Sequence, residues 1–142
     1  MSALHQAESA VALGDWPRSW PAALAAQYVA RRRFLPEAET AWAQAWRRRL
    51  TDVHARALEC YAAACLGLGG TELPAAERAA RNLVELAPLR ETGHLLLMRA
   101  LAARGNLAEA LTAYGRLATL LREELGVSPC AAAQQLHTEL LG

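Results

Sequence analysis

The chain has 142 residues, of which 33 are alanine and 25 are leucine, while isoleucine is absent and valine and threonine together supply only 12 residues. Because sheets favour β-branched and aromatic residues and helices favour alanine and leucine, this composition argues against an all-β or α/β fold and predicts an all-α one. The 15 basic residues are all arginine and face 14 acidic ones. A net charge of +1 argues against unaided binding to duplex DNA. The length fits one domain over residues 1–142.

No segment has the character of a membrane span or an export signal. The longest stretch without a charged residue, 125–138, has 14 residues and contains glycine and proline, whereas a span needs about 20 mostly apolar ones. The first eight residues lack the basic start and apolar stretch of a signal peptide. Cys60, Cys65 and Cys130 are odd in number and show no paired spacing, as in a reduced protein. We therefore expect a cytoplasmic protein.

Glycine and proline divide the chain into helix-length segments. After a first short helix, a second begins at Asp15 or at Ser19. Ser19 is preferred because it places Pro21 in the first turn, where a missing N–H is tolerated. The segment 34–36, which ends in proline, closes this helix. A long helix without glycine or proline is then predicted from about residue 39 to 66.

Four further helices follow the glycines at 67–70. Their predicted ranges are 74–87, 91–104, 106–125 and a last helix that Ser128 and Pro129 start and that runs to Leu141. Asn106 and Glu109 have the spacing of a capping box. Gly126 is placed as a left-handed cap. The total is about seven helices.

The helix after Asn106 shows the clearest amphipathic period. Its apolar and small residues recur at i, i+3, i+4 and i+7, namely Leu107, Ala110, Leu111, Tyr114, Leu117, Ala118, Leu121 and Leu125. The polar side chains fall on the other face, which predicts one buried stripe.

Weak internal repeats accompany these helices. A glycine followed by an alanine-rich helix recurs after Gly14, Gly70 and Gly105. The 35 residues from Gly70 to Gly105 are close to the 34-residue tetratricopeptide period. Units of this kind cannot bury their apolar faces alone, so they must stack. We therefore expect a tetratricopeptide-like helical repeat array.

Several segments resemble one known family. The most specific of them is Glu124-Leu125-Gly126-Val127-x-Pro129. The others are Phe34-Leu35-Pro36, Trp42, Arg47-Arg48-x-Leu50, Ala57-Leu58, Glu91, Leu97-Met98-Arg99-Ala100-Leu101, Gly105, Glu109-Ala110-Leu111-x-x-Tyr114 and Leu136-His137. Together they resemble the bacterial transcriptional activator domain of SARP-type regulators over nearly the whole chain.

The resemblance implies an all-helical, tetratricopeptide-like domain of transcription regulators. In that family the domain usually follows a winged-helix DNA-binding domain and is often joined to ATPase or sensory modules. This sequence contains no winged helix and no glycine-rich phosphate loop, so a piece of a longer regulator and a stand-alone relative both remain open. The family carries no catalytic residues to transfer.

The cysteines and histidines do not indicate catalysis. Cys60 and Cys65 lie about 140° apart on an ideal helix, and no histidine follows at i+3 or i+4. His94 is expected to pack in the interior. A nucleophile would need an orienting histidine and a third group, and no local signature shows one. We expect no enzyme, no cofactor and no metal site.

The candidate partner-binding residues are arginines and tryptophans. They are Arg31, Arg32, Arg33, Trp42, Trp46, Arg47, Arg48 and Arg49. Trp42 and Trp46 share one face of a helix and either anchor it against the first repeat, the preferred interpretation, or form an exposed patch. The segment 31–49 has six arginines and two glutamates, which fits a solvated helix face or contact with an acidic partner or phosphate.

We therefore expect a protein-interaction and regulatory domain of a bacterial transcription regulator. It would dock on its own DNA-binding domain, on RNA polymerase or on a second copy in a homodimer. It would neither bind DNA alone nor enter a membrane. The alternatives are a stand-alone adaptor that binds a peptide or helix, and a small-molecule sensor.

Overall fold

The computed structural model describes residues 3–12, 23 and 41–142 of the chain. These residues form six α-helices and one short 3₁₀ turn, and no strand occurs among them. The helices are α1 (Ala3–Ala12), α3 (Ala41–Leu68), α4 (Leu73–Leu86), α5 (Glu91–Ala103), α6 (Leu107–Leu125) and α7 (Ala131–Leu141), with η1 at Gly70–Glu72. The prediction of an all-α fold is confirmed, and the six helices of this part of the chain are near the predicted total of about seven.

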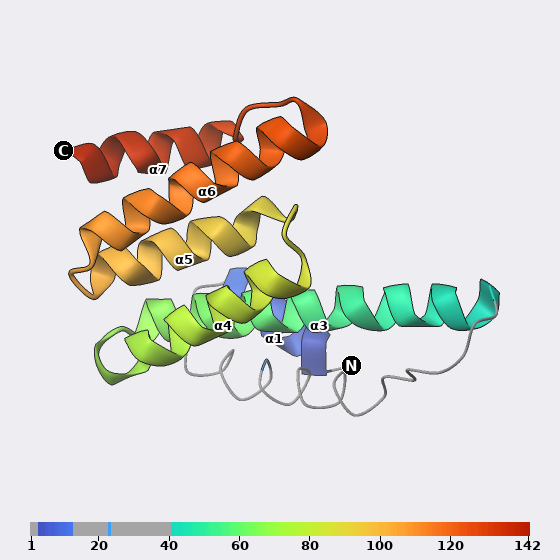
Figure 1. The fold of residues 1–142 in the computed structure, drawn as a ribbon. Helices are drawn as coiled ribbons and strands as arrows, with labels where there is room; N and C mark the ends of the chain where they lie inside the picture. The colour runs from blue at the N-terminus through green and yellow to red at the C-terminus, as the bar shows by residue number, and fades with distance from the viewer. Residues whose placement is uncertain (1–2, 13–22, 24–40) are drawn as a thin grey trace.

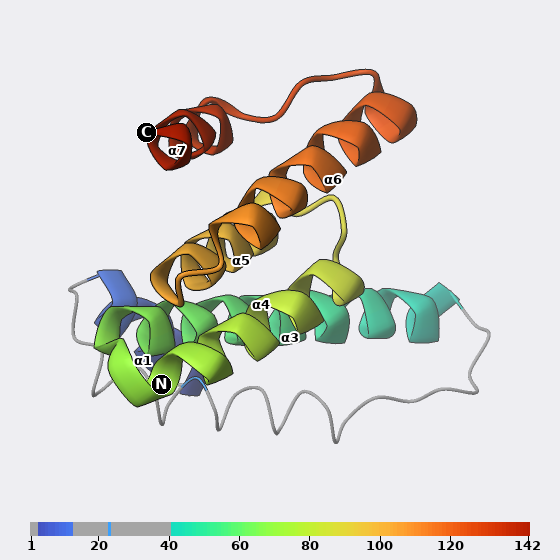
Figure 2. The ribbon, with the colours of Figure 1, turned by 60° about the vertical axis from the view of Figure 1, so that its left-hand side comes forward.

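The helices stack in chain order (Figure 1). Each of α3 to α6 packs on the next, and α5 also contacts α3 and α7, the elements two places away. The second view shows α6 crossing above α4 and α5, with α7 on the side of α6 away from α4 (Figure 2). This alternation of neighbour and next-neighbour contacts fits the predicted tetratricopeptide-like array, in which each unit buries its apolar face against the next.

One continuous core joins α3 to α7. Its largest fully buried side chains include Leu58, Leu83, Met98, Leu101, Leu117 and Leu121. The stripe predicted on α6 is confirmed in its central part, where Ala110, Leu117 and Leu121 are buried. Its two ends, Leu107 and Leu125, are exposed.

The C-terminal helix docks through an aromatic contact. The rings of Tyr114 on α6 and His137 on α7 stack with centroids 3.9 Å apart and planes 6° apart. The backbone N–H of Cys130, just before α7, donates a 2.8 Å hydrogen bond to Oε1 of Glu91 at the start of α5. Together these contacts fix α7 to both helices of the preceding pair.

Asn106 is the N-cap of α6 as predicted, but its predicted capping box and the predicted start of the last helix are wrong. Asn106 makes no side-chain cap bond, and its N–H, which Glu109 would accept in a capping box, already donates to the carbonyl of Leu101 at 2.8 Å. The last helix begins at Ala131 and not at Pro129, because the bond between Cys130 and Glu91 fixes Cys130 as the N-cap.

The turns, by contrast, follow the glycines. Gly105 (φ 84°) and Gly126 (φ 66°) both have the left-handed conformation that other residues rarely adopt, so the prediction of a left-handed cap at Gly126 is confirmed. The predictions for Asp15, Ser19 and 34–36, and the first copy of the repeat, lie outside the described residues.

Ion pairs join the helix pairs at their edges. Glu77 on α4 has a mostly buried side chain and accepts bonds from Arg81 (3.0 Å) and from Arg104 at the end of α5 (2.7 Å). Burial alone would raise the pKa of Glu77, but the hydrogen bonds and charges of these two arginines outweigh it and hold the pKa below its ordinary value.

A carboxylate with a lowered pKa stabilises the folded state above its ordinary pKa, and this stability is lost as the pH falls through the lowered value. We therefore expect Glu77→Gln to lower the free energy of unfolding by roughly 1 kcal/mol at pH 7, and by progressively less as the pH falls below about 4. Urea unfolding of both proteins at several pH values measures this. Glu85→Gln, at an exposed position, is the control. An equal loss at pH 7 and pH 3 would contradict the prediction.

Candidate interaction surfaces

The N-terminal part of α3 extends beyond the other described helices. Figures 1 and 2 both show it projecting from the side of the stack, and we call residues 41–51 the α3 arm. Within the arm, Ala43 and Leu50 are buried, whereas Trp42 is 70% exposed. The arm therefore has one buried side and one that carries a large exposed aromatic ring.

The two tryptophans of the arm stack on each other. Their ring centroids are 6.2 Å apart and their planes lie 2° apart. Trp46 is half-buried, so it supports the exposed ring of Trp42 from one side. The exposure of Trp42 does not favour the preferred interpretation, that both tryptophans anchor α3 against the first repeat, whereas it fits the alternative of an exposed aromatic patch.

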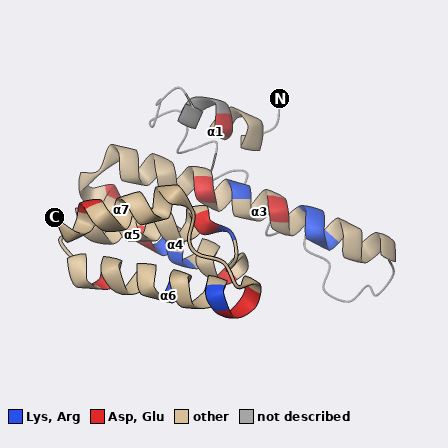
Figure 3. Ribbon diagram, turned by 90° about the horizontal axis from the view of Figure 1, so that it is seen from above, with Lys and Arg blue, Asp and Glu red and all other residues tan. Residues whose placement is uncertain are grey.

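The second arginine triplet lies on the same arm. Arg48 and Arg49 are exposed and Arg47 is half-buried, as expected because successive residues on a helix point about 100° apart. Figure 3 shows this basic band on the part of α3 that projects from the stack. Of the predicted residues, the arm thus brings together the two tryptophans and one triplet. Arg31, Arg32 and Arg33 lie outside the described residues.

The base of the arm is held by a chain of ion pairs. Arg56 on α3 binds Glu8 on α1 at 2.7 Å and Asp52 at 3.8 Å. Arg90, before α5, binds Asp52 at 3.6 Å and Glu59 at 2.7 Å. These pairs connect α1, α3 and the start of α5, so the arm projects from a base fixed on two sides.

Cys60, Cys65 and His94 lie in buried positions. Cys60, Cys65 and Cys130 all carry thiols. Burial, with the nearby carboxylates of Glu8 and Glu59, raises the pKa of the Cys60 thiol to about 11, so it is protonated near neutral pH. His94 is buried as predicted, and its Nε2 donates to the carbonyl of Pro88 at 2.7 Å. Among the described residues, no three or more His, Cys, Asp and Glu side chains come together as a metal site would need.

A second surface was not foreseen from the sequence. It is a cleft of about 470 Å³ between α4 and α6, with α5 as its floor, and we call it the α4–α6 cleft. Its lining residues are Arg81, Val84, Glu85, His94, Leu97, Leu101, Glu109, Thr112, Ala113 and Arg116. They are spread over 36 positions in three helices, so no local motif marks the cleft. The only signal in the sequence is charged residues on the polar face of α6.

The stacked helix pairs define the chain as a tetratricopeptide-like helical-repeat protein. It belongs to the bacterial transcriptional activator domain family, whose model matches residues 2–141. Comparison with curated proteins gives no match, and neither does comparison with solved structures. None of the described helices combines the length and apolar character needed to cross a membrane. Membership of the family makes this a regulatory domain of the transcription-activator type.

Proposed function

We propose that this domain regulates transcription by docking a protein partner on the α3 arm. The observation that carries the proposal is the stacked pair of Trp42 and Trp46, with Trp42 70% exposed beside two exposed arginines. Tryptophan and arginine dominate the binding energy of many protein interfaces, because they combine a large contact area with directional polar contacts. A side chain of this size left exposed on a projecting helix is suited to binding.

The partner proposed first is RNA polymerase, with the regulator's own DNA-binding domain and a second copy of this chain as the alternatives. The basic band of the arm favours an acidic surface on any of them, because opposite charges steer association and fix its orientation. No reaction is involved in this mechanism. Its output is a binding equilibrium that brings the transcription machinery to a promoter or keeps the DNA-binding domain in one arrangement.

Binding to bacterial RNA polymerase holoenzyme tests the proposal. We expect the purified chain to bind the enzyme, and we expect Trp42→Ala and the double variant Arg48→Glu/Arg49→Glu each to weaken binding by tenfold or more, at roughly 1.4 kcal/mol per factor of ten. The double variant Arg78→Glu/Arg122→Glu changes charge equally at exposed sites off the arm and should bind normally.

Three outcomes separate the possible partners. Polymerase binding that the arm variants leave unchanged would contradict docking through the arm. Absence of polymerase binding, with a dimer that the arm variants dissociate, would move the function to self-association. Strong, salt-sensitive binding to a duplex DNA control would instead show that the domain contacts DNA itself.

The α4–α6 cleft favours one alternative function, an adaptor that binds a helix or peptide of a partner. A small-molecule sensor is tested by a thermal-shift screen, because a ligand that binds only the folded state raises the melting temperature.

A further inference from the structure

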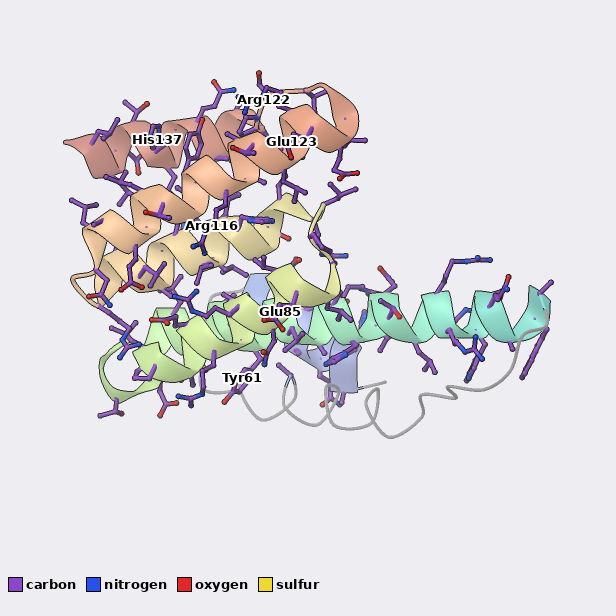
Figure 4. The ribbon with its side chains drawn as sticks, viewed as in Figure 1. Tyr61, Glu85, Arg116, Arg122, Glu123 and His137 are labelled. Carbon is purple, nitrogen blue, oxygen red and sulfur yellow. The ribbon has the colours of Figure 1, made fainter. Side chains whose placement is uncertain are left out.

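The α4–α6 cleft is a wedge that is closed at one end. Arg81 on α4 reaches Glu109 on α6, with Nη2 and Oε2 3.4 Å apart, and Glu77 holds the same guanidinium at 3.0 Å. From this closed end α6 rises away from α4, so the walls diverge toward the C-terminal end of α4 (Figures 2 and 4). The helices themselves therefore fix the direction in which an occupant can lie.

The floor of the cleft is apolar. Leu97, Leu101 and Ala113 are buried in the core but border the cleft, and half-buried Val84 extends the apolar surface up the α4 wall. His94 also lies there, with its Nε2 bonded to the carbonyl of Pro88. An occupant would gain mainly by covering apolar surface.

The two rims carry opposite charges. Glu85 lines the α4 side and Arg116 lines the α6 side, and Figure 4 shows them on opposite walls. Both side chains are exposed, and neither makes a side-chain hydrogen bond or an ion pair with the residues that the structure describes. The rims thus offer one acidic and one basic contact on either side of an apolar strip.

We propose that the cleft binds an amphipathic helix of a protein partner, with a basic residue on the flank facing Glu85 and an acidic one on the flank facing Arg116. The α6 wall runs from Glu109 to Arg116, seven residues or about 10.5 Å. An amphipathic helix places its anchors at i, i+3 or i+4, and i+7, which spans the same length. Small ligands are usually enclosed on most sides, whereas Glu85, Glu109, Thr112 and Arg116 leave this cleft open to solvent.

This proposal deepens the adaptor alternative given above by naming the charge pattern of the bound helix, and the site lies on other helices than the α3 arm. The test uses three synthetic 18-residue helical peptides with the same leucine anchors. One carries Lys on one flank and Glu on the other, the second carries Glu on both, and the third carries Lys on both. Fluorescence anisotropy of labelled peptides with the full chain measures affinity.

The native chain should prefer the mixed peptide over either of the others by about two- to fivefold, the range of one exposed ion pair. Glu85→Arg makes both rims basic and should shift the preference to the Glu peptide. Arg116→Glu makes both rims acidic and should shift it to the Lys peptide. A further mixed peptide with the Lys and Glu flanks exchanged covers the opposite direction of the bound helix, and the better-binding mixed peptide is the one compared.

A bulky side chain inside the cleft provides a second measurement. Thr112→Trp should weaken the binding of all three peptides by at least about tenfold. Thr138→Trp is the matched control, because Thr138 on α7 is also exposed and also bonds the carbonyl four residues earlier. Arg48→Glu/Arg49→Glu should leave peptide binding unchanged, so failure of the arm proposal and failure of this one are distinguishable.

The proposal is overturned if no peptide binds, if Thr112→Trp and Thr138→Trp bind equally, or if the charge reversals leave the preferences unchanged. It is also overturned if Thr112→Trp dissociates a dimer of this chain, since the occupant is then a second copy. Binding of the dye 1-anilinonaphthalene-8-sulfonate that Thr112→Trp blocks and no peptide displaces would assign the cleft to a small molecule instead.

Discussion

Replacing Leu83 by alanine is expected to lower the free energy of unfolding by about 2–5 kcal/mol, the range for truncating a buried leucine. Leu83 is fully buried on α4 and belongs to the core that joins α3 to α7. Leu83 lies where α4 packs on α5, next to Gly93, so its removal leaves a space that the surrounding helices fill only in part. The whole free energy of unfolding of a small domain is about 5–15 kcal/mol, so this loss is a large part of the stability.

Chemical denaturation followed by circular dichroism measures this loss. Leu107→Ala is the matched control, because Leu107 is 45% exposed and the same atoms are removed. We expect the control to lose less than about 1 kcal/mol. Equal losses for the two variants would mean that the α4–α5 interface is not the core of the fold.

Gly93→Ala is expected to cost about 1–3 kcal/mol, although alanine is the better helix former. A Cβ at position 93 on α5 would lie 3.0 Å from Cγ and 3.3 Å from Cδ2 of Leu83, and 3.5 Å from Cγ2 of Val84. The first distance is closer than carbon atoms ordinarily approach, so α4 and α5 would have to separate or Leu83 would have to leave its rotamer.

Gly115 provides the control for this substitution. It lies within α6, and a Cβ there meets nothing within 4 Å. We expect Gly115→Ala to stabilise the fold by about 0.5–1 kcal/mol, because glycine in a helix loses more conformational freedom on folding than alanine does. Opposite signs for the two glycine variants in thermal or urea unfolding are the expected result, and the same sign would contradict the close packing of α4 on α5.

The double variant Leu83→Ala/Gly93→Ala tests whether the two residues are coupled. The new methyl group would occupy part of the space that Leu83 leaves, so the combined loss should be smaller than the sum of the single losses. Residues in contact commonly show coupling of about 0.5–3 kcal/mol. Additive losses would show that the two effects arise in separate places.

The sequence was informative where local chemistry decides the structure. Gly105 and Gly126 mark turns because only glycine readily adopts their positive φ, and the apolar period of α6 marks its buried stripe. It failed where a distant group intervenes. Nothing near Ser128 in the sequence reveals that Glu91 already accepts a bond from the backbone N–H of Cys130. The capping box at Asn106 failed for a local reason, because the N–H of Asn106 bonds the carbonyl of Leu101 five residues earlier.

The candidate surfaces show the same division. The spacing of Trp42 and Trp46 predicts that they share a face, and the structure places their rings in a stack. Whether that face is buried or exposed depends on how far α3 extends past α4, and this length cannot be read from the composition of α3. The α4–α6 cleft was missed because its two walls come from helices that are not consecutive in the chain. Glu85 and Arg116 come to face each other only when α4 and α6 pack on α5.

The projection of the α3 arm has a consequence for how many molecules the domain can hold. Its eleven residues reach about 16 Å beyond the point where Asp52 is bound to Arg90. A partner on the arm and a helix in the cleft would thus occupy separate parts of one rigid body. Once one of the two partners is bound, the domain holds it close to the other, so contacts between the partners form at a raised effective concentration. Two weak contacts with the domain would then give a tighter assembly. Loss of either contact would then dissociate the assembly.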